Sequence, residues 1–193
     1  MTGRAIGDSL VRGPFTAIYP GGLNSGTSFY DRESTYYYPF DQDGAKALLK
    51  SIGLEDTDGN GFVNWPADTL GGSDVDIVLL VGSNYTTDLN LAEAVIGQLQ
   101  QIGLRVIQNA VENNQFDAMR FGGDFDWTIL RNPPSLASVV QNSTELAPVG
   151  PRTSAHHRAG PDGTLDLMPY EEELVDIVNK FISTDDNQER TEL

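Results

Sequence analysis

A run of alternating strand and helix patterns between residues 74 and 131 constrains the fold of this chain more than any other feature. Residues 75–81 are apolar and rich in β-branched side chains, a composition typical of a buried strand. Residues 91–102 repeat apolar side chains at helical spacing, and Gly103 follows where a left-handed residue would end the helix. The predicted inner face of this helix comprises Leu91, Val95, Leu99 and Ile102, flanked by Ala92 and Ile96.

Further strands and helices are predicted on both sides of this helix. One strand starts at residues 104–107 and another spans residues 125–130. Short helices are predicted at residues 42–52, after the N-cap residue Asp41, and at residues 112–120. The apolar stripe of the first short helix comprises Ala45, Leu48, Leu49 and Ile52. A strand, a crossover helix and a second strand form a βαβ unit, so the sequence predicts an α/β fold with a parallel sheet.

The predicted α/β core occupies residues 41–131, and less regular segments surround it. Residues 1–40 are rich in glycine and proline and are predicted to be an irregular lead-in. Residues 132–168 lose all periodicity and form a long loop region, and residues 169–193 are predicted to be helical. Because the lead-in is long and a last helix has hardly begun when the chain stops, we expect that the chain is truncated at both ends.

Composition excludes several classes of function. The chain of 193 residues has 28 acidic and 12 basic residues, for a formal charge of −16. Such a charge argues against nucleic acid as a partner, because nucleic-acid binders carry clustered Lys and Arg. It also disfavours binding to an anionic membrane surface. The chain has no cysteine, which excludes disulfides, thiol catalysis and cysteine-ligated zinc. The acidity itself indicates solubility or, alternatively, a site that attracts cations.

An acidic loop is the one motif that suggests a metal. Asp56, Asp58, Asn60 and Gly61 match the first, third, fifth and sixth positions of a calcium-binding EF-hand loop. The twelfth position is Ala67, where a bidentate glutamate is needed. The alternative is a turn in which the Asp and Asn side chains accept hydrogen bonds from nearby backbone amides. No cofactor is therefore expected, with calcium at these three side chains as the weaker alternative.

The chain offers no convincing catalytic group. His156 and His157 are adjacent and lie in the long loop region, without the spacing of a zinc protease. No G-x-S-x-G nucleophile elbow is present. Asp124 and Asp126 alternate along the third predicted strand and so share a face, with Trp127 on the other face. A hydrolase that uses His157 or Asp126 is the least favoured hypothesis, and we expect that the chain is not an enzyme.

The order of several short motifs resembles family 5 of the extracellular solute-binding proteins, the oligopeptide- and dipeptide-binding proteins of ABC importers. The resemblance covers about residues 30–131 and 168–193. Each motif is weak alone, but their order and spacing are specific. The motifs are Tyr38-Pro39-Phe40-Asp41, Ala45-Lys46-Ala47-Leu48-Leu49, Gly53-Leu54, Asp56-Thr57-Asp58-Gly59-Asn60-Gly61, Leu91-Ala92-Glu93-Ala94-Val95, Gln98-Leu99, Ile102-Gly103, Gly123-Asp124-Phe125-Asp126 and Glu189-Arg190.

This resemblance implies that the chain is part of the C-terminal lobe of a type II periplasmic-binding-protein-like fold. A missing N-terminal lobe would close with it over a solute, and the closed form would deliver the solute to an ABC permease in the membrane. The implied location is the periplasm. Ligands of open α/β sheets bind at the carboxyl ends of strands, which selects Trp127, Arg131 and Asn132 as candidate solute-binding residues. Trp127 could instead be a core residue.

One departure from the family concerns the solute. Peptide-binding members have an aspartate shortly after this strand that pairs with the peptide amino terminus, whereas residues 130–135 contain no carboxylate. The solute is therefore predicted to be peptide-like, or a sugar, an opine or another small polar molecule. The alternative function is a calcium-stabilised structural module with no role in transport.

Overall fold

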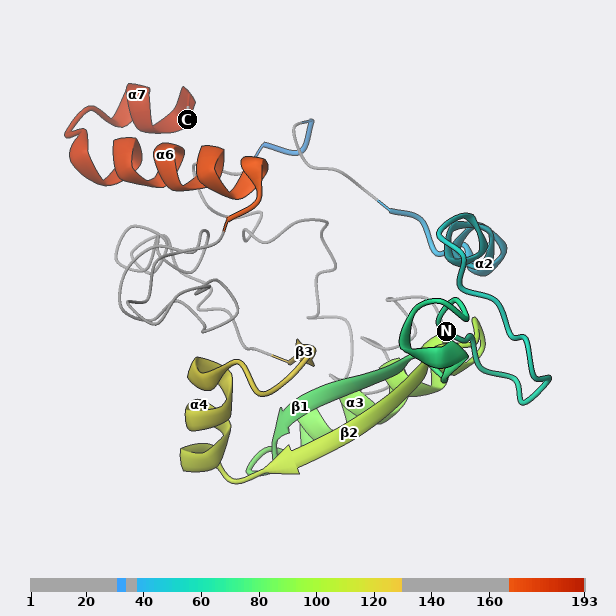
Figure 1. The fold of residues 1–193 in the computed structure, drawn as a ribbon. Helices are drawn as coiled ribbons and strands as arrows, with labels where there is room; N and C mark the ends of the chain where they lie inside the picture. The colour runs from blue at the N-terminus through green and yellow to red at the C-terminus, as the bar shows by residue number, and fades with distance from the viewer. Residues whose placement is uncertain (1–30, 34–37, 130–166, 193) are drawn as a thin grey trace. The chain divides into compact units, whose positions relative to one another are not determined.

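The computed structural model describes residues 31–33, 38–129 and 167–192 (Figure 1). These residues divide into two compact units. The first unit comprises residues 38–118 and 125–129, and the second comprises residues 31–33, 119–124 and 167–192. Among the described residues, every helix is too short or too polar to cross a membrane.

A three-stranded parallel sheet forms the centre of the first unit. It consists of β1 (Asp76–Gly82), β2 (Arg105–Val111) and the short β3 (Trp127–Thr128), in the order β2-β1-β3. The helix α3 (Thr86–Gln100) connects β1 to β2 and packs on both, as Figure 1 shows. The predicted βαβ unit and the α/β class are therefore confirmed.

The inner face of α3 differs in part from the prediction. Leu99 and Ile102 pack on the core as expected, but Leu91 and Val95 do not belong to it. The observed inner face of α3 instead includes Ala92, which is fully buried. It comprises Leu89, Ala92, Ile96 and Leu99. Alanine is small and weakly apolar, so a prediction that relies on large apolar residues gives too little weight to this buried position.

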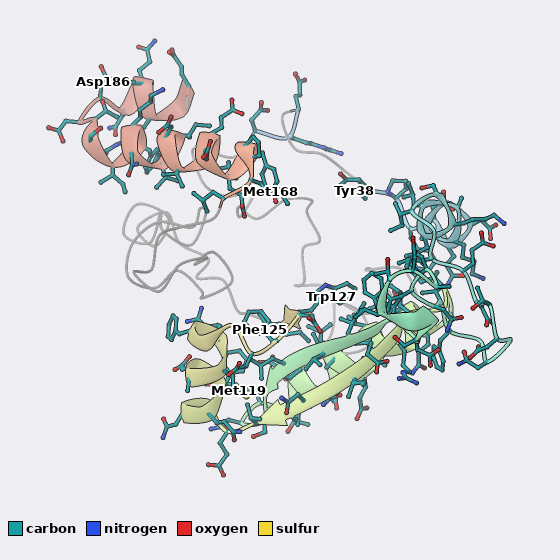
Figure 2. All side chains as sticks on the ribbon, viewed as in Figure 1. Tyr38, Met119, Phe125, Trp127, Met168 and Asp186 are labelled. Carbon is teal, nitrogen blue, oxygen red and sulfur yellow. The ribbon has the colours of Figure 1, made fainter. Side chains whose placement is uncertain are left out.

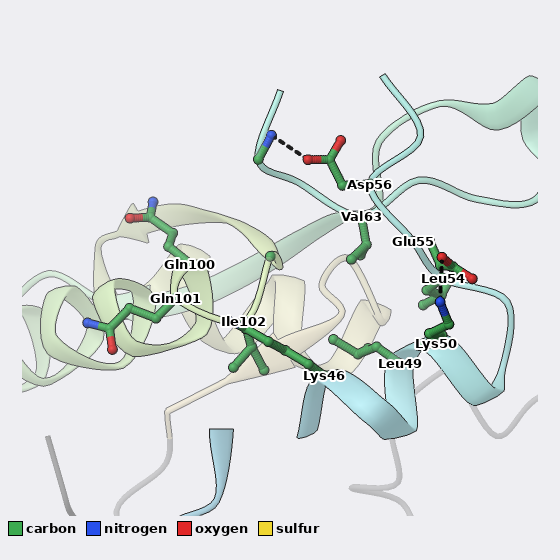
Figure 3. A pocket seen from close by; sticks show the side chains of 12 residues that line it. Lys46, Leu49, Lys50, Leu54, Glu55, Asp56, Val63, Gln100, Gln101 and Ile102 are labelled. Carbon is green, nitrogen blue, oxygen red and sulfur yellow. Dashed lines mark hydrogen bonds and ion pairs between the residues drawn. The ribbon is translucent and has the colours of Figure 1, made fainter. Parts of the chain in front are cut away.

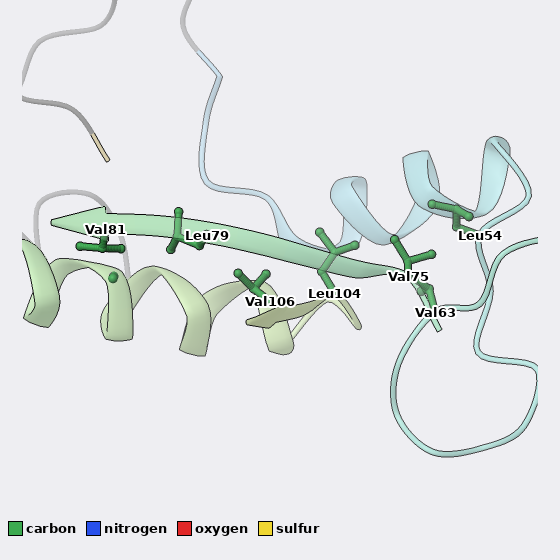
Figure 4. Packing of buried hydrophobic residues seen from close by; sticks show 8 residues of the cluster. Leu54, Val63, Val75, Leu79, Val81, Leu104 and Val106 are labelled. Carbon is green, nitrogen blue, oxygen red and sulfur yellow. The ribbon is translucent and has the colours of Figure 1, made fainter. Parts of the chain in front are cut away.

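The hydrophobic core lies between the sheet, α3 and the segment that precedes β1. Figure 4 shows how its side chains follow β1 along its length. The cluster comprises Leu54, Val63, Val75, Leu79, Val81, Ala92, Leu104 and Val106. Leu80 and Val81 on β1 are fully buried. Truncation of one such leucine to alanine typically costs about 2–5 kcal/mol, so β1 contributes strongly to the stability of this unit.

The helix α2 (Gln42–Ser51) forms where the sequence predicts it. A carboxylate oxygen of its N-cap Asp41 accepts a hydrogen bond from the backbone N–H of Gly44 at 2.8 Å. The predicted apolar stripe is only partly buried, because Leu48 and Ile52 are 70% and 68% exposed. Only Leu49 of the stripe packs against the core. The periodicity of a sequence shows that a helix is amphipathic but not which surface covers its apolar face.

Shorter elements connect these parts. A 3-10 turn, η2 (Leu70–Gly72), precedes β1, and the helix α4 (Asn113–Gly122) lies between β2 and β3, as predicted. The strand β3 is much shorter than the predicted strand over residues 125–130, since only two residues pair with β1. Just before β3, the carboxylate of Asp126 accepts the hydrogen bond that the backbone N–H of Val78 on β1 donates.

The second unit contains two described helices, α6 (Pro169–Ser183) and α7 (Asn187–Glu192). The side chain of Glu171 accepts a hydrogen bond from the backbone N–H of Met168 at 2.8 Å and satisfies one donor at the start of α6. Arg190 on α7 donates to the carbonyl of Phe181 on α6 at 3.2 Å, and its guanidinium lies over the Phe181 ring. These contacts hold the two helices of the predicted helical segment together.

Candidate functional site

The carboxyl edge of the sheet is the expected place for a ligand, because parallel strands end there together. The strand β1 ends at Gly82, and the backbone N–H of Ser83 then donates to the carbonyl of Val111 at the end of β2, at 2.8 Å. Tyr85 follows at the N-cap of α3 and is 51% exposed. This edge therefore presents an aromatic side chain that the sequence analysis did not select, although its place just after the first strand was a usable signal.

Trp127 lies on β3 and is 40% exposed, so it is not a buried core residue (Figure 2). It pairs with Leu79, near the middle of β1 rather than at its carboxyl end. Among the described residues β3 is an edge strand: it pairs with β1 along one edge, and no described strand pairs with its other edge. An indole exposed on such an edge offers a flat apolar face and one N–H donor to a ligand.

Asp126 holds β3 against β1 through its side chain. Its carboxylate Oδ2 accepts a hydrogen bond from the backbone N–H of Val78 at 2.8 Å. Its own backbone N–H donates to the carbonyl of Val78 at 3.2 Å. Asp126 therefore bonds both backbone groups of one β1 residue. From the sequence, this carboxylate was only a weak catalytic candidate, and this structural contact was not predicted.

Within the described part of the chain, the other candidate residues are not brought together into one site. Arg131, Asn132 and the histidines His156 and His157 lie outside the described residues. Asp124 has an exposed side chain, and its backbone N–H donates to the carbonyl of Met119 at 3.0 Å. Nothing in the described part of the chain places a nucleophile or a histidine beside Asp126 or Asp124.

The acidic loop is held by hydrogen bonds within the protein. The two carboxylate oxygens of Asp56 accept from the backbone N–H groups of Gly59 at 2.7 Å and Gly61 at 2.9 Å. A carboxylate oxygen of Asp58 accepts from the N–H of Asn60 at 3.1 Å. This is the turn geometry that the sequence analysis gave as the alternative to calcium. Among the described residues, no group of three or more His, Cys, Asp or Glu side chains is arranged to hold a metal ion.

An ion-pair cluster joins this loop to the sheet. The guanidinium of Arg105 at the start of β2 bonds Asp74 at 2.7 Å and binds both oxygens of Asp76 on β1. The hydrogen bond and the charge of Arg105 lower the pKa of Asp76, against a smaller opposing effect of burial. The bond to Asp76 likewise raises the pKa of Arg105. The cluster fixes the start of the β1–β2 pair and leaves no free carboxylate there for chemistry.

An open groove of about 330 Å³ lies at the opposite, amino edge of the sheet (Figure 3). It runs between α2, the acidic loop and the end of α3. Lys50 and Glu55 form an ion pair of 3.2 Å at one side. The lining residues are Lys46, Leu49, Lys50, Leu54, Glu55, Asp56, Gly61, Val63, Gln100, Gln101, Ile102 and Gly103. Because ligands of open α/β sheets bind at the carboxyl edge, this groove does not support the predicted solute site.

Comparison with known proteins identifies relatives over nearly the whole chain. Residues 4–145 match the family described as bacterial extracellular solute-binding proteins, family 5 Middle. A periplasmic alpha-galactoside-binding protein of Rhizobium meliloti (strain 1021) is 64% identical over 190 residues, which are 98% of this chain and 27% of that protein.

Solved structures give the same result. The periplasmic binding protein MelB of Agrobacterium fabrum C58, in complex with stachyose, is 61% identical and superposes with a TM-score of 0.90, over 100% of this chain and 29% of that protein. The oligopeptide-binding protein OppA is 20% identical with a TM-score of 0.74, over 90% of this chain and 30% of that protein, which shows a shared fold. The chain thus spans less than a third of the length of these relatives.

Proposed function

The chain belongs to family 5 of the bacterial extracellular solute-binding proteins, and from this premise we propose that its parent protein binds an α-galactoside oligosaccharide. By parent protein we mean the product of the longest reading frame that contains this chain. The bound sugar would be passed to an ABC permease in the membrane. The observation that carries the proposal is the identity of 64% and 61% to two proteins whose names or complexes specify α-galactoside or stachyose as ligand.

The family, the fold and the periplasmic location were predicted correctly. The family comprises extracellular proteins, and the Rhizobium meliloti relative is a periplasmic protein. The parallel sheet superposes on structures of periplasmic binding proteins. The relatives named above are binding proteins rather than enzymes, so the proposed mechanism is closure of two lobes over a solute, without a reaction.

A sugar rather than a peptide also fits the chemistry of this chain. The sequence after β3 has no carboxylate between residues 130 and 135 that could pair with a peptide amino terminus. Sugars are neutral, so their sites need hydrogen-bonding groups and flat apolar surfaces instead of a fixed counter-charge. We propose that the exposed ring of Trp127 packs on the apolar face of a pyranose, with Arg131 and Asn132 supplying polar contacts after the strand.

Tyr85 is a second aromatic candidate for the same solute. It is 51% exposed and follows β1 directly at the carboxyl edge. Its ring and hydroxyl combine apolar contact with hydrogen bonding, which suits a hydroxylated ring. The acidic loop has no part in this proposal, because we propose that its own hydrogen bonds stabilise it without calcium.

A binding assay with matched solutes tests this function. Isothermal titration of the purified parent protein would compare stachyose and melibiose with lactose, which is a β-galactoside, and with a tripeptide. We expect saturable binding of the two α-galactosides and much weaker or no binding of the other two. Tight binding of the tripeptide without binding of any sugar would contradict the proposal.

A further inference from the structure

We infer that Asp126 is the positioning residue that sets the orientation of Trp127 for contact with the sugar. This inference rests on the proposed function, because it concerns how one side chain of the proposed site is held. Asp126 directly precedes Trp127, and its carboxylate is bonded to the backbone of β1 rather than to another side chain.

Trp127 lies between two sets of bonds to β1. Before it, the N–H of Val78 donates to the carboxylate Oδ2 of Asp126 at 2.8 Å, and the N–H of Asp126 donates to the carbonyl of Val78 at 3.2 Å. After it, the hydroxyl of Thr128 and the N–H of Ile129 donate to the carbonyl of Leu80 at 3.1 and 3.3 Å. The residues directly before and after Trp127 therefore each make a side-chain hydrogen bond to β1.

The side-chain bonds are important because β3 is so short. Only Trp127 and Thr128 pair with β1, so few ladder bonds define the register of this strand. A shift of one residue would turn Trp127 to the opposite face of the sheet, since strand side chains alternate. The carboxylate of Asp126 replaces the carbonyl that would otherwise accept from Val78, and it binds at one register only.

The geometry requires a hydrogen-bond acceptor on the side chain of residue 126. It does not require a negative charge. The accepting atom is one carboxylate oxygen, and the donor is a neutral backbone amide. An asparagine in the same rotamer presents a carbonyl oxygen of the same reach. A residue that instead contacted the sugar directly through its charge would not tolerate that substitution. The two roles therefore predict different results for asparagine and alanine.

The test combines sugar affinity with a signal from the indole itself. The parent protein would be labelled with 5-fluorotryptophan, and the ¹⁹F resonance of Trp127 would be assigned with Trp127→Phe. The variants are Trp127→Ala, Asp126→Ala, Asp126→Asn and the control Asp124→Asn, which removes a nearby exposed carboxylate whose side chain does not bond β1. Stachyose is the probe, and Trp65, which packs against the core, provides an internal reference resonance.

We expect Trp127→Ala and Asp126→Ala each to weaken stachyose binding by about tenfold, the equivalent of one lost contact of ordinary strength. In Asp126→Ala the Trp127 resonance should broaden or shift and stop responding to stachyose, while the Trp65 resonance stays unchanged. Asp126→Asn should keep the affinity within about twofold and keep the response of Trp127, because the acceptor is retained. Asp124→Asn should behave as the unmodified protein.

Three results would overturn the inference in distinguishable ways. If Trp127→Ala weakens binding and Asp126→Ala does not, Asp126 has no positioning role, but the proposed site stands. If Asp126→Asn binds as poorly as Asp126→Ala while Trp127 still responds normally, Asp126 acts through its charge and not through the strand. If the unmodified protein binds no α-galactoside, the proposed function fails and this inference fails with it. Should Asp126→Ala not fold, Asp126→Ser, whose side chain is one atom shorter and falls short of the Val78 N–H, takes its place in the comparison with Asp126→Asn.

Discussion

Asn64 donates a hydrogen bond from its side-chain amide to a carboxylate oxygen of Asp74 at 2.9 Å, and this bond ties the acidic loop to the start of the sheet. The side-chain carbonyl of Asn64 accepts from the backbone N–H and from the hydroxyl of Thr57, at 2.7 and 2.9 Å. Asn64 is only 2% exposed, so its own side chain depends on these partners rather than on water for its hydrogen bonds.

Replacement of Asn64 by alanine should destabilise the protein by about 1–3 kcal/mol, because this buried side chain makes three hydrogen bonds, to Thr57 and Asp74, that alanine cannot make. Urea denaturation measures the change, and hydrogen exchange at the amide of Thr57 locates it. The matched control is Asn90→Ala on the exposed surface of α3, which should change stability little. Equal effects of the two substitutions would show that the buried bonds of Asn64 contribute nothing.

Two glycines of the α3 region should respond to alanine in opposite directions. Gly103 has a φ of +88°, and an added Cβ would lie 3.2 Å from Cγ1 of Val63, so Gly103→Ala should cost about 1–2 kcal/mol. Gly97 lies inside the helix with open space around it, so Gly97→Ala should stabilise the protein by about 0.5–1 kcal/mol. Thermal unfolding of the two variants checks both signs, and a stabilising Gly103→Ala would contradict the described helix end.

The Asp76–Arg105 pair predicts a defined dependence of stability on pH. Because Arg105 lowers the pKa of Asp76 in the folded state, the stabilisation is fully present above the ordinary value near 3.8. It is lost as the pH falls below that value and through the lower folded pKa. Asp76→Asn should therefore destabilise the protein more at pH 7 than at pH 3, and the difference at pH 7 should shrink in high salt.

The control for this experiment is Glu93→Gln, which removes an exposed carboxylate on α3. Its effect on the urea midpoint should be small at both pH values. If Asp76→Asn and the unmodified protein differ equally at pH 7 and pH 3, the contribution of Asp76 does not depend on its ionisation.

Calcium should not stabilise the protein through the acidic loop. The oxygens of Asp56 already accept hydrogen bonds from two loop amides, at 2.7 and 2.9 Å, so a cation would have to break these bonds. We expect the same melting temperature with millimolar calcium and with a chelator. A rise with calcium that a chelator reverses, and that Asp56→Asn abolishes, would instead support the calcium-stabilised alternative.

The sequence predicted the elements whose side-chain pattern is strong. The run of β-branched residues in β1, the helical repeat of α3 and the N-cap Asp41 all have local physical causes. The strand β1 and Asp41 lie where they were predicted, whereas α3 begins at Thr86, before the predicted start at residue 91. Gly103 was also predicted correctly as a left-handed residue, because little except glycine is favourable there.

The sequence failed where a side chain acts on a distant part of the chain. The bond between Asp126 and Val78 joins residues that are 48 positions apart, and no local pattern indicates it. The exposure of Leu48 and Ile52 on α2 could not be predicted either, since periodicity identifies an apolar face without identifying what covers it. The proposed roles of Arg131 and Asn132 stay predictions.

Native mass spectrometry of the gently purified parent protein tests the central claim most directly. A solute-binding protein with a closed sugar site should retain its ligand through mild purification, and the mass of the adduct then gives the class of ligand. We predict an adduct whose mass matches an oligosaccharide of hexoses and which is displaced by added stachyose. An adduct with the mass of a peptide, unaffected by stachyose, would contradict the account.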